Sequence, residues 1–117
     1  SDGGVLLLRE IDHKIQLTAE LAKIMPDPRE PSKIKHTLLS MVQQRIYGIA
    51  LGYEDLNDHA TLRHDPAIQT AVDRLDALAS SPTLCRLENR ANRQMIFEAN
   101  QLMVEKFVSI QLYFQYF

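Results

Sequence analysis

The stretch SKIKHTLLSMVQQRIYGIALG, residues 32–52, carries the clearest helical pattern in the chain. Its apolar residues recur every three or four positions, which is the period of one face of an α-helix. Ser32 is placed to cap the start of this helix, and Gly52 is placed to end it. We therefore expect one amphipathic helix with an opposite polar stripe. The apolar face comprises Ile34, Leu38, Val42, Ile46 and Ile49, and the polar stripe comprises Lys33, Thr37, Ser40 and Gln44.

Two further helices and a loop are predicted before this stretch. Apolar residues recur at helical spacing over residues 2–15, after an opening Asp-Gly-Gly. Thr18 is expected to cap a second, short helix. Residues 26–31 read PDPREP, and their prolines predict a loop.

Cap signals divide the downstream half into further helices. Asp55 or Asn57 can cap a short helix. Asp65-Pro66 and Ser81-Pro82 both show an N-cap residue followed by proline at the first helical position. Helices are therefore expected to start at residues 66 and 82.

A long helix is expected at the end of the chain, where apolar residues form a ladder with steps of three or four positions. The sequence shows no repeat and no strong strand pattern. We predict an all-α fold, with residues 1–117 forming one helical domain of about six or seven helices. The ladder consists of Ile96, Ala99, Met103, Phe107, Ile110, Phe114 and Phe117.

Composition limits the class of protein. The chain has 117 residues, which fits one domain, and 45% of them are hydrophobic, enough to form a core. No stretch approaches the roughly 20 apolar residues of a membrane-spanning helix. The single cysteine, Cys85, excludes an internal disulfide and is expected to be a buried thiol. A reducing, cytoplasmic setting fits best.

Residues 53–65, YEDLNDHATLRHD, resemble a metal or catalytic cluster in composition. Helical i, i+4 spacing would bring Asp55 near His59, and Glu54 near Asp58. However, neither an HExxH motif nor EF-hand spacing is present. We favour helix capping for this segment, with a contact to DNA or to a partner, or a metal, as alternatives. We predict no metal ligand and no catalytic residue in the chain.

Charge is unevenly spread, although the net charge of −2 gives no overall nucleic-acid signal. Residues 29–45 and 81–95 are basic, and residues 54–76 between them are acidic. Solvated helix faces remain a simple explanation for this pattern.

Residues 79–94, ASSPTLCRLENRANRQ, are the segment that best suits DNA. A helix start attracts phosphate, and Arg and Asn side chains make bidentate contacts with bases. With a preceding helix at 66–72 or 74–79, the segment is compatible with a helix-turn-helix, although an ordinary surface helix remains possible. The primary DNA-binding candidates are Ser81, Thr83, Arg86, Asn89, Arg90 and Arg93, and the secondary phosphate contacts are Lys33, Lys35 and Arg45.

Three long motifs give the sequence a resemblance to a known family. SDGGVLLLREID (1–12), QQRIYGIALGYEDLNDHATLRHDPAIQTAV (43–72) and LASSPTLCRLENR (78–90) resemble the N-terminal region of bacterial insertion-sequence transposases of the DDE superfamily, of the kind called DDE domain group 1. The resemblance covers residues 1–107. It implies binding to the double-stranded DNA of terminal inverted repeats during DNA transposition.

The resemblance also implies where catalysis belongs. The family uses two divalent metals such as Mg²⁺, held by an Asp-Asp-Glu triad on an RNase H-like domain. The first triad Asp lies on a strand downstream of the region matched here, whereas this chain ends in IQLYFQYF. We therefore expect a truncated helical N-terminal domain that lacks the catalytic domain, holds no cofactor and is inactive alone.

A second function remains open. The domain could be a dimerisation or inhibitory module without specific DNA binding, which pairs with another copy or with full-length transposase through its last helix. The aromatic residues Tyr113, Phe114, Tyr116 and Phe117 favour this alternative, because an uncovered apolar face tends to find a partner.

Overall fold

A computed structural model describes residues 2–116, with side chains for residues 3–112, 114 and 115. The described residues form seven α-helices and two short 3-10 helices and contain no strand, so the all-α prediction is confirmed. The α-helices are α1 (Asp2–Ile15), α2 (Leu17–Ile24), α3 (Leu38–Ala50), α4 (His59–Leu62), α5 (Pro66–Ala71), α6 (Ser81–Glu88) and α7 (Arg93–Tyr116). The 3-10 helices are η1 (Pro31–Lys33) and η2 (Leu56–Asp58).

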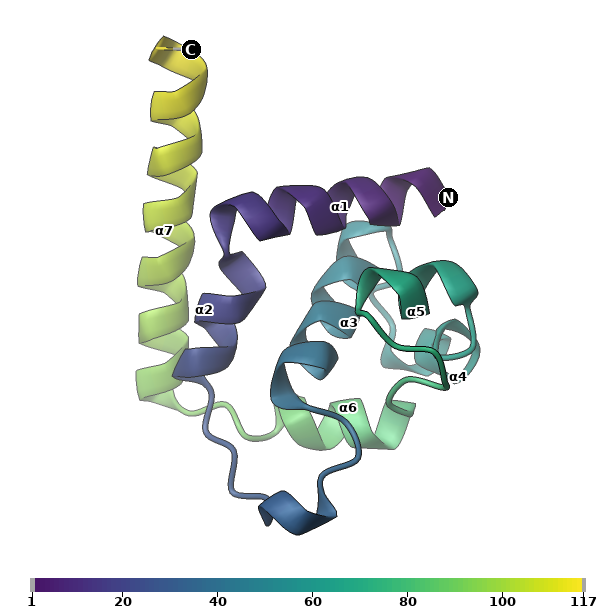
Figure 1. Cartoon of the computed structure of the whole chain (residues 1–117). Coiled ribbons are helices and arrows are strands. Elements are labelled where there is room, and N and C mark those ends of the chain that lie inside the picture. Colours follow the sequence, from purple (N-terminus) through teal and green to yellow (C-terminus); the bar gives the residue numbers. More distant parts are fainter. Residues whose placement is uncertain (1, 117) are drawn as a thin grey trace.

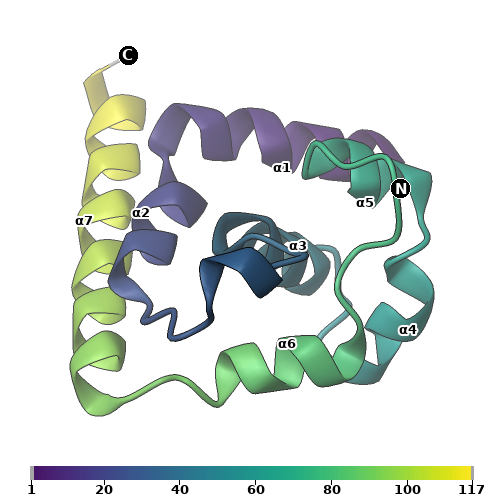
Figure 2. The same ribbon diagram turned by 60° about the horizontal axis from the view of Figure 1, so that its bottom comes forward.

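Helix α3 lies at the centre of the fold. Viewed nearly along its axis, it is surrounded by α1, α2, α4, α5 and α6 (Figure 2). Tyr47 joins a cluster of buried apolar residues with Val5 of α1 and Ile68 of α5, and Met41 joins a second cluster with Leu84 and Leu87 of α6. The central helix therefore connects two parts of the core.

The start of α3 differs from the prediction. The helix begins at Leu38, where the Thr37 hydroxyl accepts a hydrogen bond from the Ser40 amide at 3.1 Å. Ser32 lies in η1 instead and donates to Glu30. The prediction that Ser32 caps α3 is therefore wrong, whereas Gly52 follows the end of the helix with a positive φ of 100° as expected.

The expected polar stripe of α3 is also wrong in part, because Ser40 and Gln44 are buried. The Gln44 amide donates to the Ala79 carbonyl at 2.9 Å and accepts from the Ala79 amide at 3.1 Å. Its nitrogen also lies 3.1 Å from Nδ1 of His59. The polar side chain tolerates burial because its hydrogen bonds are made inside the protein.

The junction of α1 and α2 is held by a buried carboxylate. Asp12 accepts hydrogen bonds from the Thr18 amide at 2.9 Å and from the Tyr47 hydroxyl at 2.6 Å, and the Thr18 hydroxyl donates to it as well. Thr18 lies inside α2 rather than at its N-cap, a position that Gln16 occupies with a left-handed backbone. The prediction that Thr18 caps α2 is wrong because its groups bind Asp12.

Two predicted caps are confirmed and one is displaced. Asp55 accepts from the Asn57 amide at 2.9 Å, and Asp65 accepts from the Ala67 amide at 2.8 Å. Helix α6 is capped by Ser80, one residue before the predicted Ser81.

No helix forms at 74–79. Residues 72–80 instead connect α5 to α6, and α6 packs on η2 and α3. This connection is longer than the roughly three- or four-residue turn of a helix-turn-helix.

Helix α7 extends beyond the body of the molecule (Figure 1). It packs against α2, where Leu102 is buried and Lys106 forms an ion pair with Glu20 at 3.0 Å. The predicted long helix is thus confirmed, and the ladder residues Ile96, Met103, Phe107 and Phe114 are exposed. The side chains of Tyr113 and Tyr116, and Phe117 altogether, lie outside the described residues.

Two further features bear on the predictions. Cys85 is exposed on α6, so the expectation of a buried thiol is wrong: the buried face of that helix is formed by Leu84 and Leu87. No helix among residues 2–116 is long and apolar enough to cross a membrane.

Candidate nucleic-acid interface

Six cationic side chains line a hollow between the loop that follows α2 and the start of α6. We call it the basic hollow; its volume is about 320 Å³. His36 and the hydroxyl residues Ser80 and Thr83 line it together with the cationic residues, and no carboxylate is among the lining residues. The cationic residues are Arg29, Lys33, Lys35, Arg63, Arg86 and Arg90.

Half of these cations are paired with acids near the hollow. Asp27 accepts from Nε of Arg29 at 2.7 Å and lies 3.5 Å from Nη1 of Arg90. The hydrogen bond from Arg29 lowers the pKa of Asp27 to about 2, so this carboxylate stays charged. Lys33 pairs with Glu30 at 3.4 Å. Asp27 thus ties the loop to the C-terminal end of α6.

The other three cations have no carboxylate partner in the described part of the chain. Nε of Arg63 donates to the Leu78 carbonyl at 3.0 Å, and Arg86 donates to the Thr83 hydroxyl at 3.1 Å. The Lys35 side chain is exposed. Lys35, Arg63 and Arg86 therefore keep N–H donors and positive charge available for an anion.

The surroundings of the hollow lower the pKa of His36. Burial lowers the pKa of His36, and the nearby charges of Arg74 and Lys35 lower it further. An imidazole with a lowered pKa is neutral near pH 7, so it adds no charge there.

The structure brings together five of the residues chosen from sequence and separates the others. Asn89 and Arg93 are exposed near the turn from α6 to α7, and the Ser81 hydroxyl donates to the Leu56 carbonyl at 2.7 Å. Arg45 lies elsewhere, bonded to Glu88 at 2.5 Å and to two backbone carbonyls. The five residues in the basic hollow are Lys33, Lys35, Thr83, Arg86 and Arg90.

Sequence reasoning missed four residues of the hollow: Arg29, His36, Arg63 and Ser80. Arg29 was visible as a cation in the basic segment, but its loop gave no helical spacing by which to place it. Arg63 belongs to the acidic segment, and only the packing of residue 63 against residue 78 brings it to α6.

Residues 53–65 do not assemble a catalytic cluster. Asp55 and Asp65 cap helices, whereas His59 is fully buried with Nδ1 beside Gln44. Burial lowers the pKa of His59, which keeps the ring neutral. No group of three His, Cys, Asp or Glu residues among 2–116 is arranged to hold a metal ion, so the described residues do not fit the divalent metals that the family resemblance implies.

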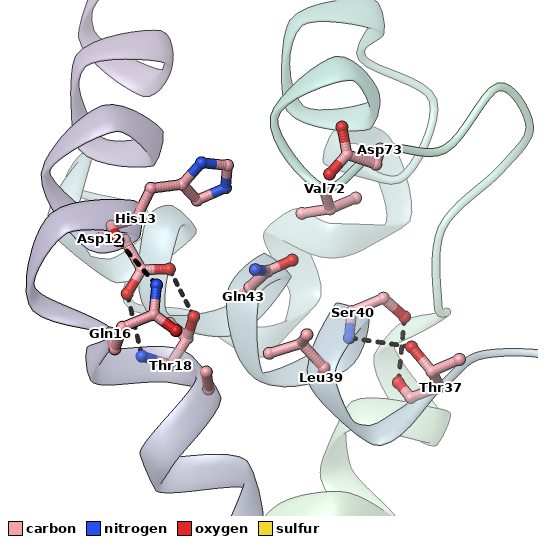
Figure 3. Close-up of a pocket in the computed structure, with 11 residues that line it drawn as sticks. Asp12, His13, Gln16, Thr18, Thr37, Leu39, Ser40, Gln43, Val72 and Asp73 are labelled. Carbon is pink, nitrogen blue, oxygen red and sulfur yellow. Dashed lines mark hydrogen bonds between the residues drawn. The ribbon is translucent and has the colours of Figure 1, made fainter.

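A second hollow of about 330 Å³ lies between α1, α3 and the turn after α5, and we call it the polar hollow. Figure 3 shows Asp12 and His13 on one side, Gln43 at the centre, and Val72 and Asp73 across from them. No Lys or Arg is among its lining residues, in contrast to the basic hollow.

Comparison with known proteins connects these features to one family. The family model described as Transposase DDE domain group 1 matches residues 1–112. No curated protein matches the chain, and no solved structure does. The match spans all seven α-helices, including most of α7, and therefore both hollows.

Proposed function

The chain belongs to the Transposase DDE domain group 1 family, and on this premise we propose that it binds the DNA of transposon ends and helps assemble the transposase–DNA complex. Family membership supports a role in transposition. The observation that carries the DNA contact is the basic hollow, where six cationic side chains meet without a carboxylate in the lining. DNA presents a closely spaced row of phosphates, and cations that neutralise them supply much of the binding free energy.

Within this proposal the hollow holds the DNA backbone. Lys35, Arg63 and Arg86 contact phosphate directly, because their charges are not neutralised by a carboxylate. Arg29 and Arg90 add positive potential and form part of the wall of the hollow, since both already pair with Asp27. Phosphate contacts of this kind fix the position of a protein on a duplex but carry no sequence information.

In this proposal, a surface beside the hollow recognises the bases. Asn89 and Arg93 are exposed beside the hollow, where α6 ends and α7 begins. Both side-chain types can make paired hydrogen bonds with base edges in the major groove. Arg45 is excluded from our interface because Glu88 and two carbonyls occupy its guanidinium.

We assign no catalytic step to this region. The divalent metals and the acidic triad of the family belong, in our proposal, to a separate catalytic domain, and residues 2–116 supply DNA contact and assembly.

The test is a titration of duplexes selected from a random pool, carried out at two salt concentrations. The double variant Lys35→Ala/Arg86→Ala should bind at least about tenfold more weakly, and its salt slope should fall by about 1.8 if two phosphate contacts are lost. Both side chains are exposed, so the fold should survive their removal.

The matched control is Lys14→Ala/Lys23→Ala. It removes the same charge from exposed lysines outside the hollow. Equal losses in both double variants would indicate a general charge effect, and unchanged affinity in Lys35→Ala/Arg86→Ala would refute the hollow as the DNA site.

A second candidate function rests on α7. Its exposed apolar side chains favour pairing with another copy of the chain, as a dimerisation or inhibitory module. Molar mass that rises with protein concentration, together with absent DNA binding, would select this function. The exposed side chains are Ile96, Phe97, Met103, Val104, Phe107, Val108, Leu112 and Phe114.

A further inference from the structure

His36 lines the basic hollow, and its ring has no hydrogen-bond partner within the described part of the chain. The residue is only 9% exposed, and the hydrogen bond from Arg29, at 2.6 Å, ends on its backbone carbonyl. The ring nitrogens are nevertheless not completely enclosed, because the enclosed polar atoms without a partner among the described residues belong to Arg9 and His59. A group bound in the hollow can therefore form hydrogen bonds with the His36 ring.

Four charged side chains act on this ring. Lys35 precedes it in the loop, Arg63 follows α4, and Arg74 and Asp76 belong to the segment that connects α5 to α6. Three of the four are cations, and the acid Asp76 already pairs with Arg74 at 3.2 Å. Burial lowers the pKa of His36, and this excess of positive charge lowers it further.

An anion in the hollow has the opposite effect on the ring. Its negative charge favours the protonated imidazole, which the surrounding cations disfavour. A protonated imidazole carries two N–H donors and no acceptor, and a phosphate oxygen is a strong acceptor for such donors. Protonation of His36 breaks no hydrogen bond of the described residues, because its ring nitrogens make none. The fold therefore permits the proton to be gained and lost.

We propose that binding of a phosphate group in the basic hollow is accompanied by protonation of His36, whose ring then donates a hydrogen bond to that group. The proton comes from the solvent, so the hollow gains one positive charge as the phosphate binds. The inference rests on the DNA contact proposed for the same hollow. It adds a form of regulation, because the contact strengthens as the pH falls.

The acids Asp27 and Asp76 do not compete for this role. Hydrogen bonds from Arg29 and Arg74 lower the pKa values of these two carboxyls, so both stay charged in mildly acidic solution. A change in anion binding between pH 7.5 and 5.5 thus cannot come from either of them.

The probe is sulfate, because it stays a dianion between pH 5.5 and 7.5, whereas inorganic phosphate titrates in this range. Binding is followed by NMR through the imidazole C–H signals of His36, at constant ionic strength. Sulfate should raise the pKa of His36, and it should bind at least about twofold more tightly at pH 5.5 than at pH 7.5. For so small a ligand the dissociation constant should be on the order of 1 mM.

Three variants locate the effect. His36→Gln keeps a polar side chain that takes up no proton, so its affinity for sulfate should not depend on pH. The matched control is His64→Gln, because His64 is an exposed histidine outside the hollow, and this variant should keep the pH dependence. Lys35→Ala/Arg86→Ala should lose the effect of sulfate on His36, since it removes cations that hold the anion. Thermal unfolding at both pH values distinguishes loss of fold from loss of binding.

Each outcome decides the proposal. A rise in the pKa of His36 with sulfate, together with pH-dependent binding that only His36→Gln abolishes while binding persists, supports it. Sulfate binding without a change at His36 would overturn the coupling but leave the hollow as an anion site. Absence of sulfate binding, or a pH dependence that survives in His36→Gln, would also overturn it. The DNA titration of Lys35→Ala/Arg86→Ala tests the DNA contact separately, so the two failures are told apart.

Discussion

Helices α3 and α7 both combine apolar and polar residues, but the rest of the molecule treats them differently. Helix α3 is enclosed, and even its polar Gln44 and the Tyr47 hydroxyl are buried and hydrogen-bonded. Helix α7 is supported by α2 alone among its larger contacts, and Phe107 and Phe114 are 62% and 78% exposed. In these two helices, a side chain is buried where another element packs against it, whether that side chain is polar or apolar.

The two helices show which interactions hold this fold together. The polar bonds of α3 link it to α1, to α4 and to residue 79, so they fix its orientation as well as its position. Such bonds are costly to break because the remaining buried groups lose their partners. The exposed apolar side chains of α7 bury little surface against the other described elements, and we expect them to contribute much less to folding.

Asp12→Ala should have the largest effect. It leaves the Thr18 amide, the Thr18 hydroxyl and the Tyr47 hydroxyl without their acceptor. We expect the free energy of unfolding in urea to fall by about 3 kcal/mol or more, a large part of the stability of a small domain. Asp58→Ala is the control, because Asp58 is exposed and caps nothing with its side chain. Similar losses in both variants would contradict the role of Asp12.

Gln44→Leu should cost about 2 kcal/mol, because it removes both hydrogen bonds to residue 79 and leaves those backbone groups buried and unpaired. The comparison variant is Gln43→Leu at the adjacent position, which loses no hydrogen bond within the described residues. Urea unfolding of the two variants should therefore differ clearly. If they lose equal stability, the Gln44 bonds do not hold α3 to the 72–80 segment.

Acid should weaken the same region through His59. Burial lowers the pKa of this ring, so as the pH falls the unfolded chain binds a proton at His59 before the folded chain does. Stability is therefore complete above the ordinary histidine pKa and declines as pH falls below it, by up to about 1.4 kcal/mol per pH unit. Urea unfolding between pH 7.5 and 5 measures the slope.

His36, whose pKa burial also lowers, contributes in the same direction. His36→Gln should remove one part of the slope, and His59→Gln should remove the other. A stability that does not change over this pH range would contradict both assignments.

Sequence patterns predicted local elements well and long-range contacts poorly. The caps at Asp55 and Asp65 follow from residues that are neighbours in the chain, and so do Gly52 and the length of α7. The start of α3 was misplaced because the Ile34 spacing continued the helical period into a segment that forms η1.

The candidate interface was predictable only in part for the same reason. Arg86 and Arg90 are four residues apart in a segment with a helical pattern, so their proximity could be predicted from the sequence, although α6 ends at Glu88 and Arg90 follows it. Arg29 and Arg63 reach the basic hollow from a loop and from the end of α4. No local sequence pattern predicts that these two residues lie close to α6. The burial of Gln44 was likewise invisible, because its partner at residue 79 is 35 positions away.

The smallest effect on stability should come from the apolar face of α7, and the same substitution in α3 makes the contrast direct. Val108→Ser alters a side chain that is 48% exposed, whereas Val42→Ser alters one that is 3% exposed. Valine and serine have similar helix propensities, so burial decides the outcome. Val108→Ser should change the unfolding free energy by less than about 0.5 kcal/mol, whereas Val42→Ser should cost about 2 kcal/mol or more. If α7 pairs with a second copy, Val104→Ser/Val108→Ser should also lower the molar mass at high protein concentration, measured by light scattering. A large stability loss in Val108→Ser would mean that α7 is a structural helix like α3, and the distinction between the two helices would fail.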